Sequence, residues 1–315
     1  MLTTRLAKLM MKAFESHPIF SENAVGELNE VFNHNSFLQA SESKQRSIMF
    51  KSSESKYNSE MHYPLDSYFG LDLSSFLQGK VALDLGCFTG GRCVAWFERY
   101  KLQHISGIDV RQVFIESAKQ FASMHNTRAD FEVGFGESLP FENKIFDAIL
   151  SFDVFEHVQN LEKTLNECYR VLKIGGRLFL VFPSYFHPIE HHLSLVTRTP
   201  CIHWFFSGKT CIRAYYEILK ERGDKAYWYK RLSANVESWE RGNTINGITL
   251  SQFKAIIKGM NWRVVRPVSK PIGSIGRNIS RNRLIRTMSK LFSPLTKIPG
   301  LREIFLHRIT YILEK

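Results

Sequence analysis

The chain has 315 residues, of which 44% are hydrophobic and 23% charged, and its formal net charge is +12 at pH 7. This length accommodates one large domain with additions, and the hydrophobic content supports a packed globular core. No apolar run is long enough to span a membrane, and charged residues interrupt the first 20 positions, which excludes the apolar core of a signal peptide.

The cysteines are odd in number and show no C-x-x-C spacing. They are Cys87, Cys93, Cys168, Cys201 and Cys211. Such a set predicts neither a disulfide framework nor a metal site, and a reducing compartment is then the default. We therefore expect a cytoplasmic protein without a bound metal ion.

The N-terminal part is expected to form an extension that covers residues 1–77. Residues 1–40 place apolar side chains at helical spacing. The side chains on one side of this helical pattern are Leu6, Leu9, Met10 and Phe14. The stretch 41–59 is rich in Ser, Lys and Glu, which predicts a loop or mobile segment.

From residue 78 onward, strand and helix patterns alternate, which indicates a parallel sheet. The expected strands cover 81–85, 105–110, 130–134, 146–152, 177–182, 262–267 and 309–313. The expected helices cover 91–100, 112–123, 161–172 and 250–260. The helix at 161–172 should stop at Gly175 and Gly176, as at a C-terminal glycine cap. We therefore expect an α/β fold with a doubly wound, mostly parallel seven-stranded sheet.

A glycine-rich turn joins the first strand to the helix that follows it. Residues 81–92 are Val-Ala-Leu-Asp-Leu-Gly-Cys-Phe-Thr-Gly-Gly-Arg. Glycine allows positive φ and a close approach to a ligand, and the helix N-terminus offers unpaired N–H groups. Phe88 occupies the second glycine position of a nicotinamide-type G-x-G-x-x-G fingerprint, and no lysine completes a Walker loop. The spacing therefore excludes both of these nucleotide-binding loops.

Further segments follow in order. Residues 104–109 predict a second strand that ends in an acid, residues 136–141 are Gly-Glu-Ser-Leu-Pro-Phe, and residues 146–152 predict another buried strand. Together with the glycine-rich turn, these segments resemble the class I S-adenosylmethionine-dependent methyltransferases. The resemblance is specific over about residues 78–182 and general beyond them.

The resemblance implies a Rossmann-like methyltransferase domain over residues 78–315. Residues 78–182 would form the cofactor half, and residues 183–315 would supply the acceptor region and the last strands. In this family the last two strands form an antiparallel hairpin, so a basic stretch at about 268–305 would be an insertion within it.

The resemblance also implies S-adenosylmethionine as the cofactor and a set of residues that hold it. Asp109 would accept hydrogen bonds from the ribose hydroxyls, because an acid about 20 residues beyond the glycine loop fits that role. The glycine-rich turn would hold the amino-acid tail, with Asp84 orienting the loop or accepting from the ammonium group through water. The residues expected to bind the cofactor are Asp84, Gly86, Cys87, Phe88, Gly90, Asp109, Val110, Gly136, Glu137 and Phe152.

Two positions depart from the family's pattern. Phe88 interrupts the commoner D-x-G-x-G-x-G sequence, so its ring must point away from the cofactor or pack against it. Phe135 stands where an acid commonly meets the adenine amino group, which leaves the backbone N–H groups of Gly136 and Glu137 for the adenine ring.

Methyl transfer to a hydroxyl group requires alignment and benefits from a base that removes the proton. Histidine is suited to this role near neutral pH. His157 lies in a Glu-His-Val segment similar to that of many small-molecule methyltransferases, and His187, His191 and His192 follow the fifth strand. These four are the candidate bases, with packing or capping as their alternative role. A metal site built from Glu190 and the two adjacent histidines lacks a recognised ligand spacing.

The C-terminal segment is strongly basic. Residues 261–315 hold twelve Lys or Arg and two acids, so they carry +10 of the formal net charge. Within residues 277–292, apolar side chains form a helical stripe beside Arg281, Arg283, Arg286 and Lys290. Such a helix can contact an anionic membrane surface or dock on the sheet as an ordinary helix. Nucleic acid is the less favoured partner, because no recognisable binding module accompanies the charge.

The sequence thus predicts a methyltransferase that acts on a small-molecule, sugar or lipid-linked acceptor, most simply at oxygen, with nitrogen as the variant. An RNA methyltransferase and a catalytically silent binding protein of the same fold are the alternatives. The intact set of Asp84, Gly86, Gly90 and Asp109 argues against the silent version.

Overall fold

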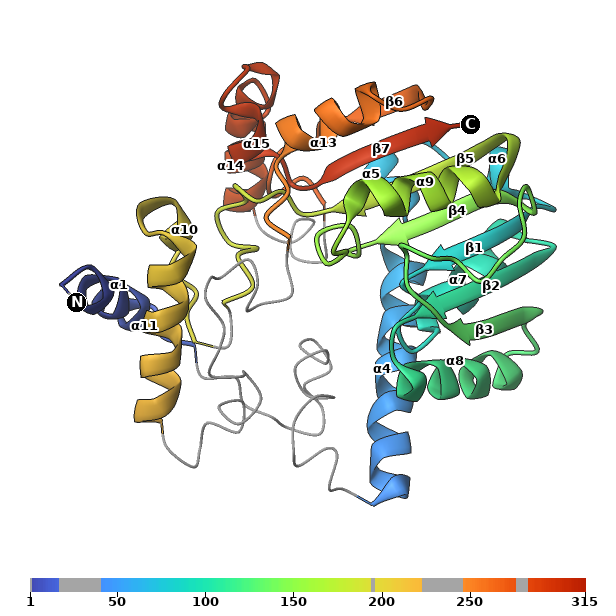
Figure 1. Ribbon diagram of the computed structural model, residues 1–315, viewed down its shortest axis with the longest axis horizontal. Coiled ribbons are helices and arrows are strands. Elements are labelled where there is room, and N and C mark those ends of the chain that lie inside the picture. Colours follow the sequence, from blue (N-terminus) through green and yellow to red (C-terminus); the bar gives the residue numbers. More distant parts are fainter. Residues whose placement is uncertain (1, 17–40, 194–195, 223–245, 276–282) are drawn as a thin grey trace. The chain divides into compact units, whose positions relative to one another are not determined.

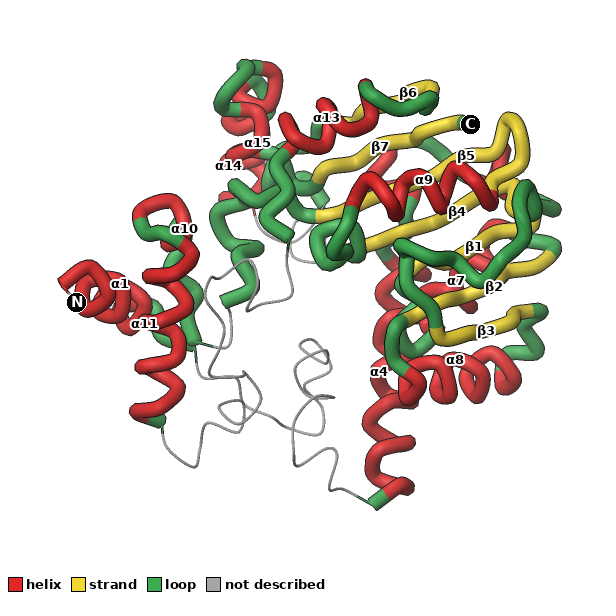
Figure 2. Tube along the Cα trace, viewed as in Figure 1, coloured by secondary structure: helices red, strands yellow, loops and turns green. Residues whose placement is uncertain are grey.

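The computed structural model describes residues 2–16, 41–193, 196–222, 246–275 and 283–315 (Figures 1 and 2). Contacts divide the chain into two compact units. The helical unit comprises Met1–Gln45 with Ser184–Ile248, and the sheet unit comprises Arg46–Pro183 with Thr249–Lys315. These limits differ from the division at residue 78 expected from the sequence.

The sheet unit contains a seven-stranded mixed sheet in the order β3-β2-β1-β4-β5-β7-β6. Its strands are β1 (Val81–Leu85), β2 (His104–Asp109), β3 (Ala129–Val133), β4 (Phe146–Phe152), β5 (Leu172–Phe182), β6 (Arg263–Val268) and β7 (Ile309–Glu314). The first five strands pair in parallel, whereas β7 is antiparallel to both β5 and β6. The predicted doubly wound, mostly parallel sheet with a terminal antiparallel pair is confirmed.

A helix follows each of the parallel strands β1, β2 and β4. These helices are α7 (Gly91–Tyr100), α8 (Gln112–Met124) and α9 (Leu161–Val171) (Figure 1). The chain moves outward from β1 to β3 in one direction and from β4 to β5 in the other. Right-handed crossovers in opposite directions place α7 and α8 on one face of the sheet and α9 on the other. The strand order therefore reverses between β1 and β4, where open α/β sheets bind their ligands.

Helix α9 ends earlier than the sequence predicted. It stops at Val171, and β5 begins at the next residue, Leu172, which pairs with Phe146 of β4. Gly175 and Gly176 consequently lie inside β5 rather than at a helix cap. The pairing of β5 with β4 shifts register between Phe146 and Ala148 of β4. Glycines within a strand often mark such an irregularity, and Gly175 and Gly176 lie in this part of β5.

The prediction of a loop or mobile segment at residues 41–59 is wrong, because Glu42–His62 forms the helix α4. This helix buries mostly polar or small side chains, among them Ser52, Ser53 and Glu60. Its sequence lacks the apolar periodicity by which an amphipathic helix is recognised, so only tertiary contacts stabilise it as a helix. The short helices α5 (Asp66–Phe69) and α6 (Ser74–Leu77) follow, and their apolar ends belong to the main core.

The C-terminal part of the sheet unit adds α13 (Leu250–Lys258) before β6. Between β6 and β7 lie α14 (Arg283–Phe292), η3 (Leu295–Lys297) and α15 (Arg302–Phe305). The helix expected within 277–292 is present from Arg283, and residues 276–282 lie outside the described residues. Among the described residues, no helix combines the length and the apolar character needed to cross a membrane.

The helical unit consists of α1 (Leu2–Ala13), α10 (Ile202–Phe205) and α11 (Gly208–Glu221). The predicted N-terminal helix is confirmed up to Ala13, and residues 17–40 lie outside the described part of the chain. Of the apolar side chains named from the sequence, Leu6 and Leu9 are exposed, while α1 buries Ala7 and Met11. The small Ala7 side chain permits close packing in a core shared with α11.

Candidate cofactor and active site

The glycine-rich loop between β1 and α7 is curled tightly against β2. The backbone N–H groups of Gly86 and Cys87 both donate to the carbonyl oxygen of Ile108, at 2.9 and 2.8 Å. Gly86 and Gly90 have φ values of +82° and +78°, and the non-glycine Phe88 also adopts a positive φ of +51°. The loop therefore leads into the N-terminus of α7, where backbone N–H groups are available to a polar ligand.

Packing within the protein also requires these glycines. A Cβ atom on Gly86 would overlap the side chain of Val154, and one on Gly90 would lie 2.7 Å from Ala118 of α8. Because contacts this short do not occur, larger residues at either position would displace the loop. The side chain of Cys87 is buried, so Cys87 can contact a ligand only through its backbone.

Phe88 directs its ring toward α8. The ring contacts Phe114 in an edge-to-face arrangement, with centroids 4.5 Å apart. The Lys56 ammonium group from α4 lies 6.0 Å from the Phe88 centroid. Burial and, to a lesser extent, the charge of Arg92 lower the pKa of Lys56 to about 8. The departure from the family's glycine pattern is thus accommodated by aromatic packing on α8.

Asp109 ends β2 and holds the loop in place. Its Oδ2 accepts from the backbone N–H of Phe88 at 3.0 Å, and its Oδ1 accepts from that of Arg111 at 3.2 Å. Burial raises its pKa despite these hydrogen bonds. Each carboxylate oxygen can accept more than one hydrogen bond, so capacity remains for the two hydroxyls of a ribose. The next residue, Val110, is exposed.

Asp84 lies near the end of the neighbouring strand β1 and is almost fully buried. Among the described residues, no donor reaches its Oδ2. Burial raises the pKa of Asp84 to about 8, with Arg92 acting in the opposite direction. A buried carboxylate oxygen without a donor is costly, and a cationic ligand group would satisfy it. This observation fits the ammonium group of S-adenosylmethionine.

Helix α4 packs against the loop and was missed by sequence analysis. The Ser53 hydroxyl donates to the carbonyl oxygen of Thr89 at 2.7 Å. Glu60 lies 3.5 Å from the Nε of Arg92, whose guanidinium group stacks 4.0 Å from the centroid of Phe152. The only sequence signal for this packing is the pair of small residues Ser52 and Ser53, which is too short to be specific.

The segment predicted to contact the adenine ring, residues 136–141, is hydrogen-bonded to the residues just before α9. The Glu137 carboxylate accepts from the backbone N–H groups of Gln159 and Asn160, at 2.7 and 3.2 Å. Gly136 lies close to Thr164 of α9, and Phe135 is exposed. The Glu137 side chain therefore positions this loop, which leaves its backbone for contacts with an adenine ring.

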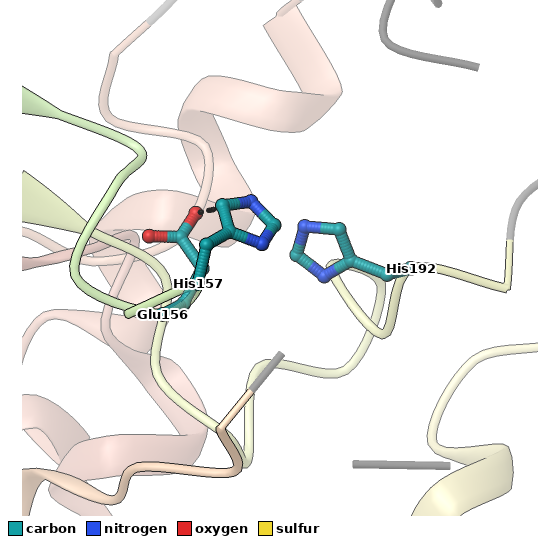
Figure 3. A group of neighbouring side chains, drawn as sticks. All are labelled: Glu156, His157 and His192. Atoms are coloured by element: carbon teal, nitrogen blue, oxygen red, sulfur yellow. Dashed lines mark ion pairs between the residues drawn. The ribbon is translucent and has the colours of Figure 1, made fainter. Parts of the chain in front are cut away.

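An acid–histidine pair follows β4. The Nε2 of His157 lies 3.6 Å from Oε1 of Glu156 (Figure 3). Glu156 is buried, whereas the His157 side chain is 32% exposed and can meet a substrate. His192, drawn in the same view, belongs to the helical unit, whose position relative to the sheet unit is not determined. Nearby, Asp153 has a positive φ and forms an ion pair with Arg308 at 3.3 Å.

The other predicted bases lie in the helical unit. His191 is buried, its Nδ1 accepts from the backbone N–H of Leu193, and its Nε2 lies 3.2 Å from the carbonyl oxygen of Thr199. His187 accepts two backbone N–H groups at its Nδ1. These contacts engage both histidines within their own loop, and His192 has a positive φ of +54°. His187 and His191 are buried, whereas the side chain of His157 is 32% exposed.

The buried His203 is a further titratable group that the sequence analysis did not single out. Its Nε2 lies 2.8 Å from the carbonyl oxygen of Tyr185. Burial lowers the pKa of both His203 and His191 to about 4. Two neutral histidines therefore lie together in the core of the helical unit, with ring centroids 5.7 Å apart.

Comparison with known proteins identifies methyltransferases as relatives of this chain. Residues 83–180 match the family described as "Methyltransferase domain". Norajmaline N-methyltransferase of Rauvolfia serpentina is 33% identical over 100 residues, which are 31% of this chain and 33% of that protein. A ubiquinone biosynthesis O-methyltransferase of Bartonella tribocorum is 33% identical over 76 residues, 24% of this chain and 31% of that one. The matches thus span about a third of the length of these curated relatives.

Among solved structures, a putative sarcosine dimethylglycine methyltransferase from Galdieria sulphuraria aligns over 80% of this chain and 82% of its own. The TM-score is 0.48 and the sequence identity is 16%.

Proposed function

We infer that this chain, which carries a class I S-adenosylmethionine-dependent methyltransferase domain, transfers a methyl group to an oxygen atom of a small-molecule, sugar or lipid-linked acceptor. The observation that carries the proposal is the pair of acids at the ends of the neighbouring strands β1 and β2. Asp84 offers a buried carboxylate oxygen that no described residue satisfies, and Asp109 retains acceptor capacity beside the glycine-rich loop.

The cofactor supplies an electrophilic methyl group on a sulfonium. The chain's own residues bind and align the partners. Asp84 attracts the ammonium group, the loop backbone holds the amino-acid tail, and Asp109 accepts from the ribose hydroxyls. Phe152, at the end of β4, lies buried against the Arg92 guanidinium and contributes an apolar wall.

We assign the base to His157. A hydroxyl acceptor must lose its proton as it is methylated, and a histidine that follows β4 can take that proton. Glu156 lies close enough to stabilise the resulting imidazolium. The exposed fraction of His157 leaves the ring accessible to an acceptor. His187, His191 and His192 remain weaker candidates, because the described contacts engage the first two in their own loop.

Nitrogen is the variant acceptor atom, since the matching relatives include proteins named as N-methyltransferases as well as proteins named as O-methyltransferases. The competing hypotheses are an RNA acceptor and a silent binding protein of the same fold. We propose that the chain acts in the cytoplasm and that residues 277–292 contact an anionic membrane surface there. Exposed Met288 and Leu291 on α14 support the membrane contact.

The proposal is tested in two steps. Calorimetry should detect binding of S-adenosylmethionine, and no binding would refute an S-adenosylmethionine-dependent activity. Cell extracts incubated with the protein and methyl-labelled cofactor should then yield a labelled small molecule in mass spectrometry. Label in RNA, together with salt-dependent RNA binding, would instead identify a nucleic-acid acceptor.

The base is tested separately. His157→Ala should lower kcat by about 10²–10⁴ while cofactor affinity is retained. His62→Ala, at the exposed end of α4, is the matched control and should leave both quantities unchanged. Wild-type turnover by the His157→Ala variant would remove His157 from this role.

A further inference from the structure

A cavity of about 540 Å³ lies at the outer edge of the sheet, within the sheet unit. We call it the edge cavity. Its walls come from α13, β6, β7 and α15, the orange and red elements of Figure 1. β6 is the outermost strand, three strand spacings from β4, or about 14 Å at the usual spacing of about 4.8 Å. The edge cavity is therefore distinct from the candidate cofactor site at the ends of β1, β2 and β4.

The floor of the edge cavity is apolar. Ile257 of α13, Trp262 and Leu306 line it and are themselves buried, and Tyr311 of β7 adds an aromatic ring. Val264 lines it from the edge strand and remains 43% exposed. A concave apolar surface of this volume, with a few polar groups at its margin, is typical of small-molecule sites.

The charged groups that line the edge cavity are all cationic. Lys254 and Lys258 are four residues apart on α13, so they project from the same side of the helix, and Arg302 faces them from α15. No Asp or Glu is among the described residues that line the cavity. Neither lysine forms an ion pair with a described residue, whereas the Nε of Arg302 donates to the carbonyl oxygen of Thr296.

Arg302 is close enough to Lys254 to act on its charge. Burial and then the charge of Arg302 lower the pKa of Lys254, while Glu303, beside the cavity, acts in the opposite direction. An anion held between the lysines and Arg302 would relieve this repulsion. Three cationic groups that line one cavity match a phosphate dianion better than a single-charged carboxylate.

We propose that the edge cavity binds one amphiphilic phosphate, a molecule with an apolar chain or ring system and a terminal phosphate. The apolar part lies on the floor formed by Ile257, Trp262 and Leu306, and the phosphate lies between Lys254, Lys258 and Arg302. This site is independent of the proposed methyl transfer, because it shares no residue with the candidate cofactor site.

Decyl phosphate, kept below the concentration at which it forms micelles, is the probe. Calorimetry with the full chain should show one saturable site, with much weaker binding of inorganic phosphate alone and of decanol alone. Lys254→Gln and Lys258→Gln should each weaken the affinity about tenfold, as expected for a charge-assisted hydrogen bond. Val264→Glu should also weaken it, because it adds an acid to the apolar wall.

Lys209→Gln, on an exposed position of α11 in the other unit, is the matched control and should bind decyl phosphate like the wild type. Cofactor affinity should stay unchanged in all four variants, which separates a failure here from a failure of the proposed activity.

The proposal is overturned if decyl phosphate shows no saturable binding, or if the two lysine variants bind it as tightly as the wild type. Equal affinity for decyltrimethylammonium would overturn it too, since the site would then not select an anion. Binding only to vesicles that contain phosphatidic acid, without saturable binding of free decyl phosphate, would identify a membrane surface contact instead and overturn the cavity site.

Discussion

The backbone carbonyl oxygen of Ser53 occupies the space that a Cβ atom on Gly91 would need. Ser53 lies on α4, and Gly91 is the first residue of α7. The Ser53 hydroxyl also donates to the carbonyl oxygen of Thr89, two residues earlier in the glycine-rich loop. Gly91 thus permits a direct approach of one helix backbone to another, and this approach fixes α4 against the loop that should hold the cofactor.

Gly91→Ala should therefore destabilise the sheet unit by about 1–3 kcal/mol, the usual cost of overpacking, and should weaken cofactor binding. Gly259→Ala is the control, because its new Cβ atom would meet nothing closer than 3.5 Å. Thermal melts and calorimetry with S-adenosylmethionine measure the two effects. Equal stability of the two variants would contradict the packing of α4 on Gly91.

Asp109→Ala should weaken binding of S-adenosylmethionine by about 1.5–3 kcal/mol, the range for hydrogen bonds to a charged group. The loss has two sources, since the variant removes the ribose acceptor and also the acceptor for the Phe88 N–H. Asp109→Asn, which keeps one oxygen, should lose less. Asp130→Ala, at a largely exposed acid on β3, should bind normally. Unchanged affinity in a folded Asp109→Ala variant would exclude Asp109 as the ribose ligand.

Asp84→Asn should stabilise the cofactor-free protein while it weakens cofactor binding. Burial raises the folded-state pKa of Asp84 to about 8 from a usual value of 3.8. The folded state then holds a proton that the unfolded state has released, so the contribution of Asp84 to stability decreases as the pH rises from about 4 to about 8. The melting temperature of Asp84→Asn should exceed that of the wild type by an amount that grows from about pH 4 to about pH 8 and is constant above about pH 8. A constant difference across this pH range would contradict the raised pKa.

His191 and His203 should make the helical unit sensitive to acid. Their pKa values fall from a usual 6.5 to about 4 on folding. Between about pH 4 and pH 6.5 the unfolded state therefore binds more protons than the folded state. Their stabilising contribution is therefore present above about pH 6.5 and is lost as the pH falls toward 4. Thermal melts of the double variant His191→Asn, His203→Asn should show a weaker pH dependence than the wild type. His62→Asn should reproduce the wild-type slope.

Residues 277–292 should direct the protein to anionic vesicles, and this binding should decrease as salt increases, because screening acts over about 10 Å at 0.1 M. Replacing Arg281, Arg283, Arg286 and Lys290 by Gln should nearly abolish binding, at up to about 1 kcal/mol per charge. Leu291→Ser should reduce the salt-resistant part, because Leu291 is exposed on α14. Co-sedimentation measures both effects. Equal binding to neutral and anionic vesicles would contradict an electrostatic membrane contact.

The sequence by itself determined the sheet and the placement of the acids on it. Strand and helix periodicities are local, so the parallel strands could be predicted from them, whereas the antiparallel pair of β6 and β7 was implied by the resemblance to the methyltransferases. The carboxyl ends of parallel strands meet at one edge, so acids at the ends of β1 and β2 had to lie close to the glycine-rich loop. Together with the resemblance to the methyltransferases, these positions predict Asp84 and Asp109 as cofactor ligands.

Only the tertiary structure decided which helix faces are buried and which polar atoms remain unsatisfied. α4 buries serines and a glutamate, and α1 buries Ala7 rather than Leu6. At Ser53 the cause is visible, because the backbone of α4 there approaches Gly91 closely. In the same way, the donor-free oxygen of Asp84 and the engaged ring nitrogens of His191 depend on groups distant in sequence. Sequence periodicity reports which residues can be buried, whereas hydrogen bonding and burial at a given atom are set by what packs around it in the folded chain.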